Sequence, residues 1–164
     1  MPTSTYNLIN STTLVSSSTG ITFSGIDQTY RDLRVTFEFP AILAGQYSVN
    51  VYIRLNGSTT AYKWVYMRGN GSAMASYAQS DQQFRANAST YTETDRYTGV
   101  FDFFDYSTNK YKSVLTRGAG FGTVDISSYA GLWSNTSAVT SIEIFTNTYT
   151  FPPGTKANLY GIVG

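Results

Sequence analysis

The sequence contains no cysteine and no histidine among its 164 residues. Without thiolate and imidazole groups, the chain lacks the usual protein ligands for zinc, copper, haem and iron–sulfur clusters. It also lacks the nucleophile and the general base of catalytic dyads and triads that use those two residues. A small scaffold held together by disulfides is excluded for the same reason. We therefore expect a non-enzymatic protein with no catalytic residues, no metal site and no cofactor.

Charge is scarce as well. Only 13% of the residues are charged, and the net charge is +1. Proteins that bind nucleic acid carry a basic patch or stripe, which this sequence lacks. No apolar run approaches the roughly 20 residues of a membrane-spanning helix. The first residues show neither the basic nor the apolar region of a secretory signal. These features predict no nucleic-acid partner and no membrane partner. They also predict a protein that stays in the cytoplasm of the cell that makes it, or leaves by lysis or by assembly into something larger.

Two stretches with alternating apolar and polar residues, 31–39 and 47–55, organise the chain. Alternation with a period of two places the apolar side chains on one face of a strand. Seven residues, 40–46, separate the two stretches. Two such strands in succession predict the centre of an antiparallel sheet with one buried face. The residues expected in the core are Leu33, Val35, Phe37, Val49, Val51 and Ile53.

Short runs of the same kind recur along the rest of the chain. Asn56-Gly57 follows one of them and predicts a tight hairpin, because both central positions of a type I′ turn need a positive φ. The glycines between Gly118 and Gly122 predict a flexible corner. Eight to ten short strands without a convincing helix predict an all-β chain, an antiparallel, jelly-roll-like β-sandwich that forms a single domain over residues 1–164. The further expected strands are 21–23, 62–67, 96–106, 111–116, 129–134, 139–146 and 156–163.

Two segments depart from this pattern. Residues 1–18 predict an N-terminal arm or edge strand, and residues 69–95 predict a long loop insertion, because no period is sustained there. The simplest interpretation of the insertion is a surface loop, and the alternative is an arm that contacts a neighbouring subunit. Their apolar residues are too sparse for a separate core, so we hypothesise that they make contacts between subunits. They are Leu8, Ile9, Leu14, Met74, Tyr77 and Phe84.

Carboxylates and tryptophans are the remaining candidates for chemistry. Asp102 and Asp105 lie three positions apart on an expected strand, so their side chains point to opposite faces and form no pair by themselves. Two carboxylates from distant strands could still build a glycosidase site, and calcium on aspartate and backbone oxygens stays open. We expect these acids to be structural or solvated. Trp64 and Trp133 are expected to pack in the core or an interface rather than to stack on sugars.

Several pieces of the sequence form a further pattern: residues 26–33, 53–57, 140–144, and 151–155 followed by 159–162. In their order and spacing they resemble a family of small virion proteins of tailed phages, common in marine and cyanobacterial phages. Together they span the chain from about residue 20 to its end. The resemblance implies a β-sandwich or jelly-roll domain on the head or tail of a virion, without catalytic residues that could be transferred. The segment 69–95 has no counterpart in the family pattern.

The resemblance implies a capsid decoration (cement) protein that binds and stabilises the head lattice. Its expected partners are the major capsid protein or other virion proteins, its expected oligomer is a homotrimer, and its expected location is the capsid surface. The alternative is a tail-fibre or spike module that binds a glycan or protein of the host surface. A polysaccharide depolymerase ranks lowest. A fibre protein usually needs a long coiled-coil, β-helical or linker segment, and this sequence contains none, which favours the head.

Overall fold

The computed structural model describes residues 5–40, 49–86, 96–120 and 125–164, and these form twelve β-strands and no helix. The strands pair only in antiparallel fashion. In chain order they are β1 (Tyr6–Thr13), β2 (Gly20–Ser24), β3 (Asp32–Phe39), β4 (Tyr52–Leu55), β5 (Tyr62–Gly69), β6 (Met74–Asp81), β7 (Phe84–Arg85), β8 (Tyr97–Phe104), β9 (Lys112–Gly120), β10 (Asp125–Trp133), β11 (Ser141–Phe145) and β12 (Lys156–Ile162).

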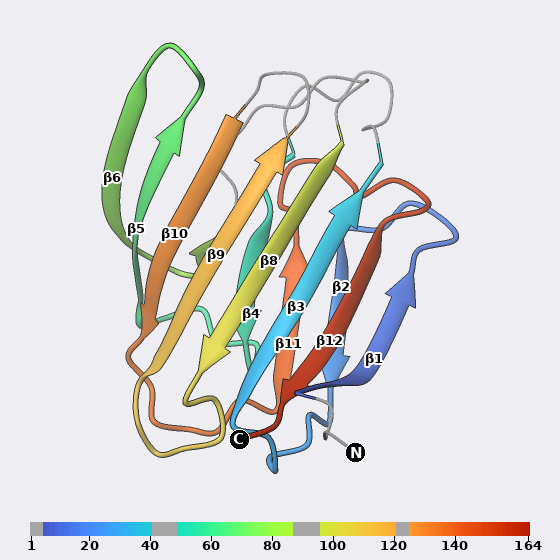
Figure 1. Cartoon of the computed structure of the whole chain (residues 1–164), viewed down its shortest axis with the longest axis vertical. Coiled ribbons are helices and arrows are strands. Elements are labelled where there is room, and N and C mark those ends of the chain that lie inside the picture. Colours follow the sequence, from blue (N-terminus) through green and yellow to red (C-terminus); the bar gives the residue numbers. More distant parts are fainter. Residues whose placement is uncertain (1–4, 41–48, 87–95, 121–124) are drawn as a thin grey trace.

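Two sheets face each other in a β-sandwich (Figure 1). The larger sheet has eight strands in the order β1-β12-β3-β8-β9-β10-β5-β6, and the smaller has four in the order β2-β11-β4-β7. Eight strands alternate between the sheets along the chain, except that β4 and β7 both lie in the smaller sheet: β1, β2, β3, β4, β7, β8, β11 and β12. Eight strands that cross between two sheets in this way form a jelly roll. The predicted fold class, an all-β jelly-roll-like sandwich, is therefore confirmed.

The other four strands form two insertions in this jelly roll. Strands β5 and β6 lie between β4 and β7 in the chain, and β9 and β10 lie between β8 and β11. Both pairs join the larger sheet beyond β8 and give it the row β9-β10-β5-β6. We call this row the four-strand extension. Because of it, the described residues hold twelve strands rather than the eight to ten that the sequence predicted.

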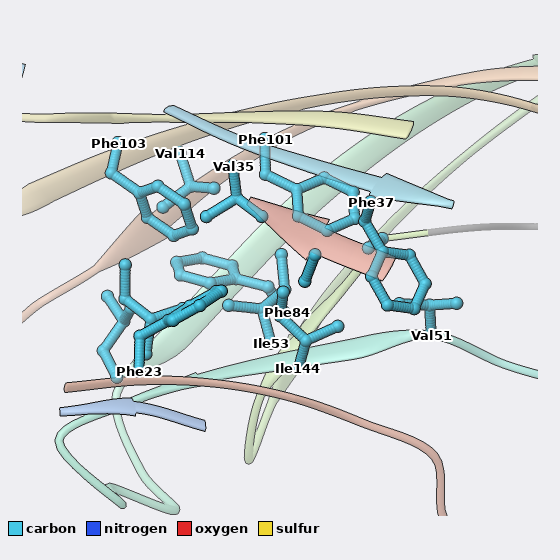
Figure 2. Packing of buried hydrophobic residues seen from close by; sticks show 14 of the residues in the cluster. Phe23, Val35, Phe37, Val51, Ile53, Phe84, Phe101, Phe103, Val114 and Ile144 are labelled. Atoms are coloured by element: carbon cyan, nitrogen blue, oxygen red, sulfur yellow. The ribbon is translucent and has the colours of Figure 1, made fainter. Parts of the chain in front are cut away.

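The core lies between the two sheets and is built from the alternating residues (Figure 2). The six residues expected there are at most 1% exposed. Figure 2 shows Phe37 and Phe101 from the larger sheet packing toward Ile53 and Ile144 from the smaller one. The period-two alternation therefore identified the buried face of both strands correctly.

The expected pairing of the two alternating stretches is wrong. β3 lies between β12 and β8 in the larger sheet, whereas β4 lies between β11 and β7 in the smaller one. The two strands face each other across the core and are not neighbours in one sheet. Alternation fixes which face of a strand is buried, but it does not say which strand lies beside it.

The Asn-Gly turn is present but joins the two sheets instead of closing a hairpin. Asn56 and Gly57 have φ angles of 52° and 65°, and the Ser58 N–H donates to the Leu55 carbonyl across the turn at 2.9 Å. The strands on either side then separate, because β5 pairs with β10 and β6. The turn chemistry was predicted correctly, and the hairpin was not.

The segment 69–95 is not one long loop, because it contains β6 and β7. Every residue of β6 except Asp81 is exposed, so neither face needs apolar residues and no periodic pattern marks the strand. The part of the expected loop at 87–95 lies outside the described residues. At the N-terminus, the expected edge strand is confirmed as β1, which pairs with β12.

The expected corner at Gly118–Gly122 is also wrong in part, since β9 continues through Gly118 to Gly120. A Cβ on Gly118 would lie 2.4 Å from the hydroxyl of Tyr97. Glycine is therefore required there because an aromatic side chain crosses the strand, and not because the chain bends. Residues 121–124 lie outside the described ranges.

Gly131 in β10 offers a test of the packing beneath the extension. A Cβ there would lie 2.4 Å from two ring atoms of Phe84, whereas a Cβ on Gly69 in the paired strand β5 would meet nothing within 4 Å. We expect Gly131→Ala to lower the free energy of unfolding by about 1–3 kcal/mol through overpacking. Gly69→Ala should stay within about 0.5 kcal/mol. Urea denaturation of both variants measures this, and equal stabilities would contradict the packing of Phe84 over β10.

Candidate interaction surface

The outer face of the four-strand extension carries large apolar side chains that no other element covers among the described residues. In β5, Val65 alternates with the buried Trp64, and in β9, Leu115 alternates with the buried Val114. Their side chains therefore point away from the core. We call four residues that are between 44% and 69% exposed the outer apolar patch: Val65, Met67, Leu115 and Ile126.

The strand register places part of this patch in one row, whereas Ile126 lies further along β10, between Gly69 of β5 and Ala119 of β9. Val65 pairs with Ala130, and Ala130 pairs in turn with Leu115, so the three residues form one row across β5, β10 and β9. Ala78 of β6 extends the same row by pairing with Val65. Directly opposed residues in antiparallel strands lie about 4.5–5.5 Å apart, so these side chains touch.

A shallow groove of about 550 Å³ runs along this row. Val65, Ala78, Ala130 and Leu132 contribute to its lining, and Lys63 is the one charged residue that lines it. A mostly apolar groove with a single cation fits the apolar surface of another protein better than it fits a charged small molecule.

The other half of the same face is polar. Arg34 of β3 holds Asp102 of β8 with two hydrogen bonds, Nε to Oδ1 at 2.6 Å and Nη2 to Oδ2 at 3.0 Å. The hydrogen bond to Asp102 raises the pKa of the Arg34 guanidinium. Arg117 adds a contact of 3.4 Å to the same carboxylate, and Tyr6 accepts a hydrogen bond from Arg34. The outer face thus carries the outer apolar patch on the extension and a satisfied ion cluster beside it, which Arg117 of β9 joins from the extension.

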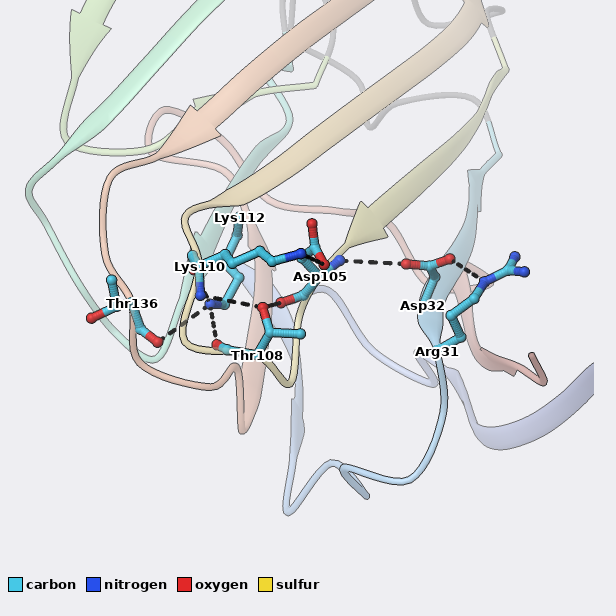
Figure 3. A network of polar contacts seen from close by, with 7 residues as sticks. All are labelled: Arg31, Asp32, Asp105, Thr108, Lys110, Lys112 and Thr136. Carbon is cyan, nitrogen blue, oxygen red and sulfur yellow. Dashed lines mark hydrogen bonds and ion pairs between the residues drawn. The ribbon is translucent and has the colours of Figure 1, made fainter.

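The two acids considered for catalysis lie in separate ion pairs. Asp102 is bound by the two arginines, while Asp105 lies 3.5 Å from the ammonium of Lys110 at the end of the sandwich (Figure 3). Among the described residues, no group of three or more Asp and Glu side chains is arranged to hold a metal ion. The same part of the chain contains no helix long and apolar enough to cross a membrane.

An aromatic cluster lies on the opposite side of the β5–β6 hairpin. The ring centroid of Tyr77 lies 6.3 Å from that of Tyr66 and 6.1 Å from that of Trp64. Tyr77 is half exposed, whereas Trp64 is buried. Trp133 is buried too and stacks on Tyr62 at 6.0 Å. Both tryptophans therefore pack in the core. The sequence predicted that they lie either in the core or in an interface.

The six residues expected at subunit contacts fall into three groups. Leu8, Met74 and Tyr77 are exposed. Ile9 and Leu14 pack against the core of their own chain.

Phe84 is a correction, because it is 1% exposed in β7 and its ring lies 4.8 Å from that of Tyr62. It stood out in the sequence as an isolated apolar residue, but β7 joins the smaller sheet and places it in the core. It is therefore not available for a contact between subunits.

The outer apolar patch was missed in the sequence. One signal was present: the run Trp64-Val65-Tyr66-Met67 has no polar residue at alternate positions, as expected of a strand with apolar groups on both faces. Leu115 and Ile126 gave no comparable signal, because only the register of β9, β10 and β5 brings them onto the same face of the sheet as Val65.

Comparison with known proteins adds little to this description. No family model and no curated protein matches the chain. A carbohydrate-binding module CBM40 of the Ruminococcus gnavus IT-sialidase, bound to α2,3 sialyllactose, aligns at 7% identity and a TM-score of 0.38, covering 96% of this chain and 95% of its own. Scytalido-glutamic peptidase aligns at 13% identity and a TM-score of 0.36, covering 87% and 74%. Similarity this low supports no inference about function.

Proposed function

We propose that this chain is a non-enzymatic virion structural protein of the capsid decoration type. In this proposal, the outer apolar patch seats the protein on the major capsid protein or another virion protein. The observation that carries it is the uncovered outer face of the four-strand extension, which exposes Val65, Met67, Leu115 and Ile126 on one face of the sheet. Apolar side chains that are exposed together on one face are typical of interaction sites.

Two further features support the proposal. The sequence resembles small virion proteins of tailed phages over most of its length, which gives the patch a class of partner. The sandwich buries a core of its own between two sheets, so the fold needs no partner to cover its inner face. The patch is thus a surface added to a self-contained jelly roll, and the insertions β5–β6 and β9–β10 supply it.

Lysine substitution within the patch tests this proposal. Leu115→Lys and Ile126→Lys place a charge in the apolar surface without touching the core, so each variant should fold with nearly wild-type stability. We expect incorporation into virus particles to fall about tenfold or more, because a buried unpaired charge costs several kcal/mol at an interface. The matched control is Thr22→Lys, which adds the same charge to an exposed residue of β2 in the smaller sheet. Wild-type incorporation of both patch variants would overturn the proposal.

A second candidate, a tail module that binds a host glycan, is favoured by one observation. The half-exposed ring of Tyr77 lies beside Tyr66, and the amide of Gln79 follows on the same side of β6. Aromatic faces with nearby amides suit the apolar and hydroxyl surfaces of a sugar ring. Glycan-array binding that is lost in Tyr77→Ala would support this candidate. Binding retained by Tyr77→Ala, or absent from the wild type, would remove it.

A further inference from the structure

Strand β6 forms an open edge of the larger sheet, and it lacks the features that normally protect such an edge. Natural edge strands are short, bulged or interrupted by proline and lysine, which prevents pairing with other chains. β6 has eight residues in an unbroken register with β5, and its sequence contains no proline, lysine or arginine. Its only charged residue, Asp81, is the last one.

The other described edges differ from β6 in these respects. β1 carries a register shift between Leu8 and Asn10, β2 has five residues, and β7 has two. Bulges and short length are recognised protection against edge-to-edge contact. Among the described strands, β6 is therefore the edge best suited to accept another strand.

The hydrogen-bonding pattern shows which backbone groups β6 offers. The Asn70 N–H donates to the Ala73 carbonyl at 3.2 Å, which makes these residues a bonded pair at the base of the turn. Bonded and non-bonded pairs alternate along antiparallel strands. The N–H and C=O groups of Ser76, Ala78 and Ser80 therefore point away from β5, toward the open side.

We propose that β6 pairs with β6 of a second copy of this chain, joining the two larger sheets into one continuous sheet. A two-fold arrangement centred on Tyr77 places Tyr77 opposite Tyr77 of the second copy and Ser76 opposite Ala78. Opposed residues then lie on the same face, as antiparallel pairing requires. Asp81 falls opposite Ala73, so the two carboxylates lie at opposite ends and no like charges meet.

The chemistry of β6 favours a second copy over an unrelated partner. The centre of β6 carries neither a charge nor a large pocket that would select a foreign peptide. A second copy of β6, by contrast, places no like charges opposite each other in this register. Pairing would also bring the two apolar grooves together, because Ala78 and Ser80 line each groove at the edge. This goes beyond the proposed attachment through the outer apolar patch, which does not require it.

The proposal is tested by the self-association of the full chain, measured by sedimentation velocity. The wild type should form a dimer at concentrations up to about 0.1 mM, where even micromolar contacts are filled. Ala78→Pro removes an N–H on the open side and leaves the bonds to β5 intact, so the variant should remain folded and lose self-association about tenfold or more. Tyr77→Lys should do the same by placing two ammonium groups opposite each other, while the control Tyr111→Lys, at an exposed tyrosine outside β6, should dimerise like the wild type.

Mixing Tyr77→Lys with Tyr77→Glu gives the decisive result, because opposite charges should restore a mixed dimer. If Ala78→Pro does not fold, the association of this mixture tests the β6–β6 pairing by itself. A wild type that stays monomeric at about 0.1 mM, a dimer that survives both β6 variants, or a mixture that fails to associate would each overturn the edge pairing. A monomeric chain that still enters particles would leave the proposed function in place and remove only this inference.

Discussion

A Phe37→Ala variant is expected to lose about 3–5 kcal/mol of unfolding free energy, because it removes a buried aromatic side chain from the middle of the core. Phe37 is 1% exposed, and its ring lies between 5.2 and 6.2 Å from the rings of Phe39, Tyr97, Phe101 and Phe151. These five rings join the larger sheet to the loop before β12, so little can move in to fill the cavity.

Urea denaturation measures this loss, with Tyr111→Ala as the matched control. Tyr111 is 53% exposed, so truncating it should change the stability by no more than about 0.5 kcal/mol. A loss below about 1 kcal/mol for Phe37→Ala would mean that the ring is not enclosed by the two sheets.

A Lys112→Met variant is expected to lose about 2–4 kcal/mol, because it leaves backbone carbonyls without a donor. Lys112 is fully buried at the end of the sandwich, where its ammonium donates to the carbonyls of Thr108, Lys110 and Thr136 (Figure 3). These bonds tie the turn between β8 and β9 to the segment after β10. Methionine is unbranched and only one atom shorter than lysine, and it removes the donors, so the loss reports chiefly the hydrogen bonds rather than the packing.

Thermal and urea denaturation of Lys112→Met and of Lys110→Met test this account. Lys110 is 70% exposed and lies 3.5 Å from Asp105. An exposed ion pair contributes little to the free energy of unfolding, so Lys110→Met should cost less than about 1 kcal/mol. Equal losses for the two variants would contradict a structural role of the buried ammonium.

The pH dependence of Lys112 follows from its burial. Burial lowers the pKa of the ammonium below its ordinary value of 10.5, and Asp105 opposes this effect. Over the interval between the two pKa values the unfolded chain holds more protons, so folding becomes more favourable as the pH rises. The stability difference between the wild type and Lys112→Met should therefore increase with pH just below 10.5. A difference that decreases there would contradict the direction of the shift.

The sequence predicted the fold class and the buried faces, because both depend on local pattern. Alternation in 31–39 and 49–55 reports burial directly, and Asn56-Gly57 reports a backbone that needs positive φ. It did not predict the pairing of strands. Pairing in a jelly roll joins residues far apart in the chain, as with Ile142 and Phe23, and no local pattern encodes that distance.

The candidate surface was only partly predictable for the same reason. Met74 and Tyr77 stood out as isolated apolar residues, and both are exposed on β6. Phe84 stood out equally and is buried, since a two-residue strand places it in the core. The outer apolar patch depends on the register of three strands, and no pattern in the sequence around Leu115 indicates that it belongs to the patch.

The capsid decoration proposal gives the exposed face of the extension a role in a repeating lattice. A lattice presents the same site many times, so a modest apolar contact at each site is sufficient when neighbouring copies also touch. A tail appendage would present far fewer sites. The number of copies in each particle therefore separates the two candidate functions more directly than any property of the isolated protein.

If the proposal is correct, the gene for this chain lies in a phage genome, and quantitative mass spectrometry of purified particles of that phage measures this number. The account predicts copies on the order of hundreds for each particle, at a fixed ratio to the major capsid protein, as a symmetric lattice requires. A few copies to some tens would place the protein on the tail and favour the glycan-binding candidate. Its absence from purified particles would contradict a virion role altogether.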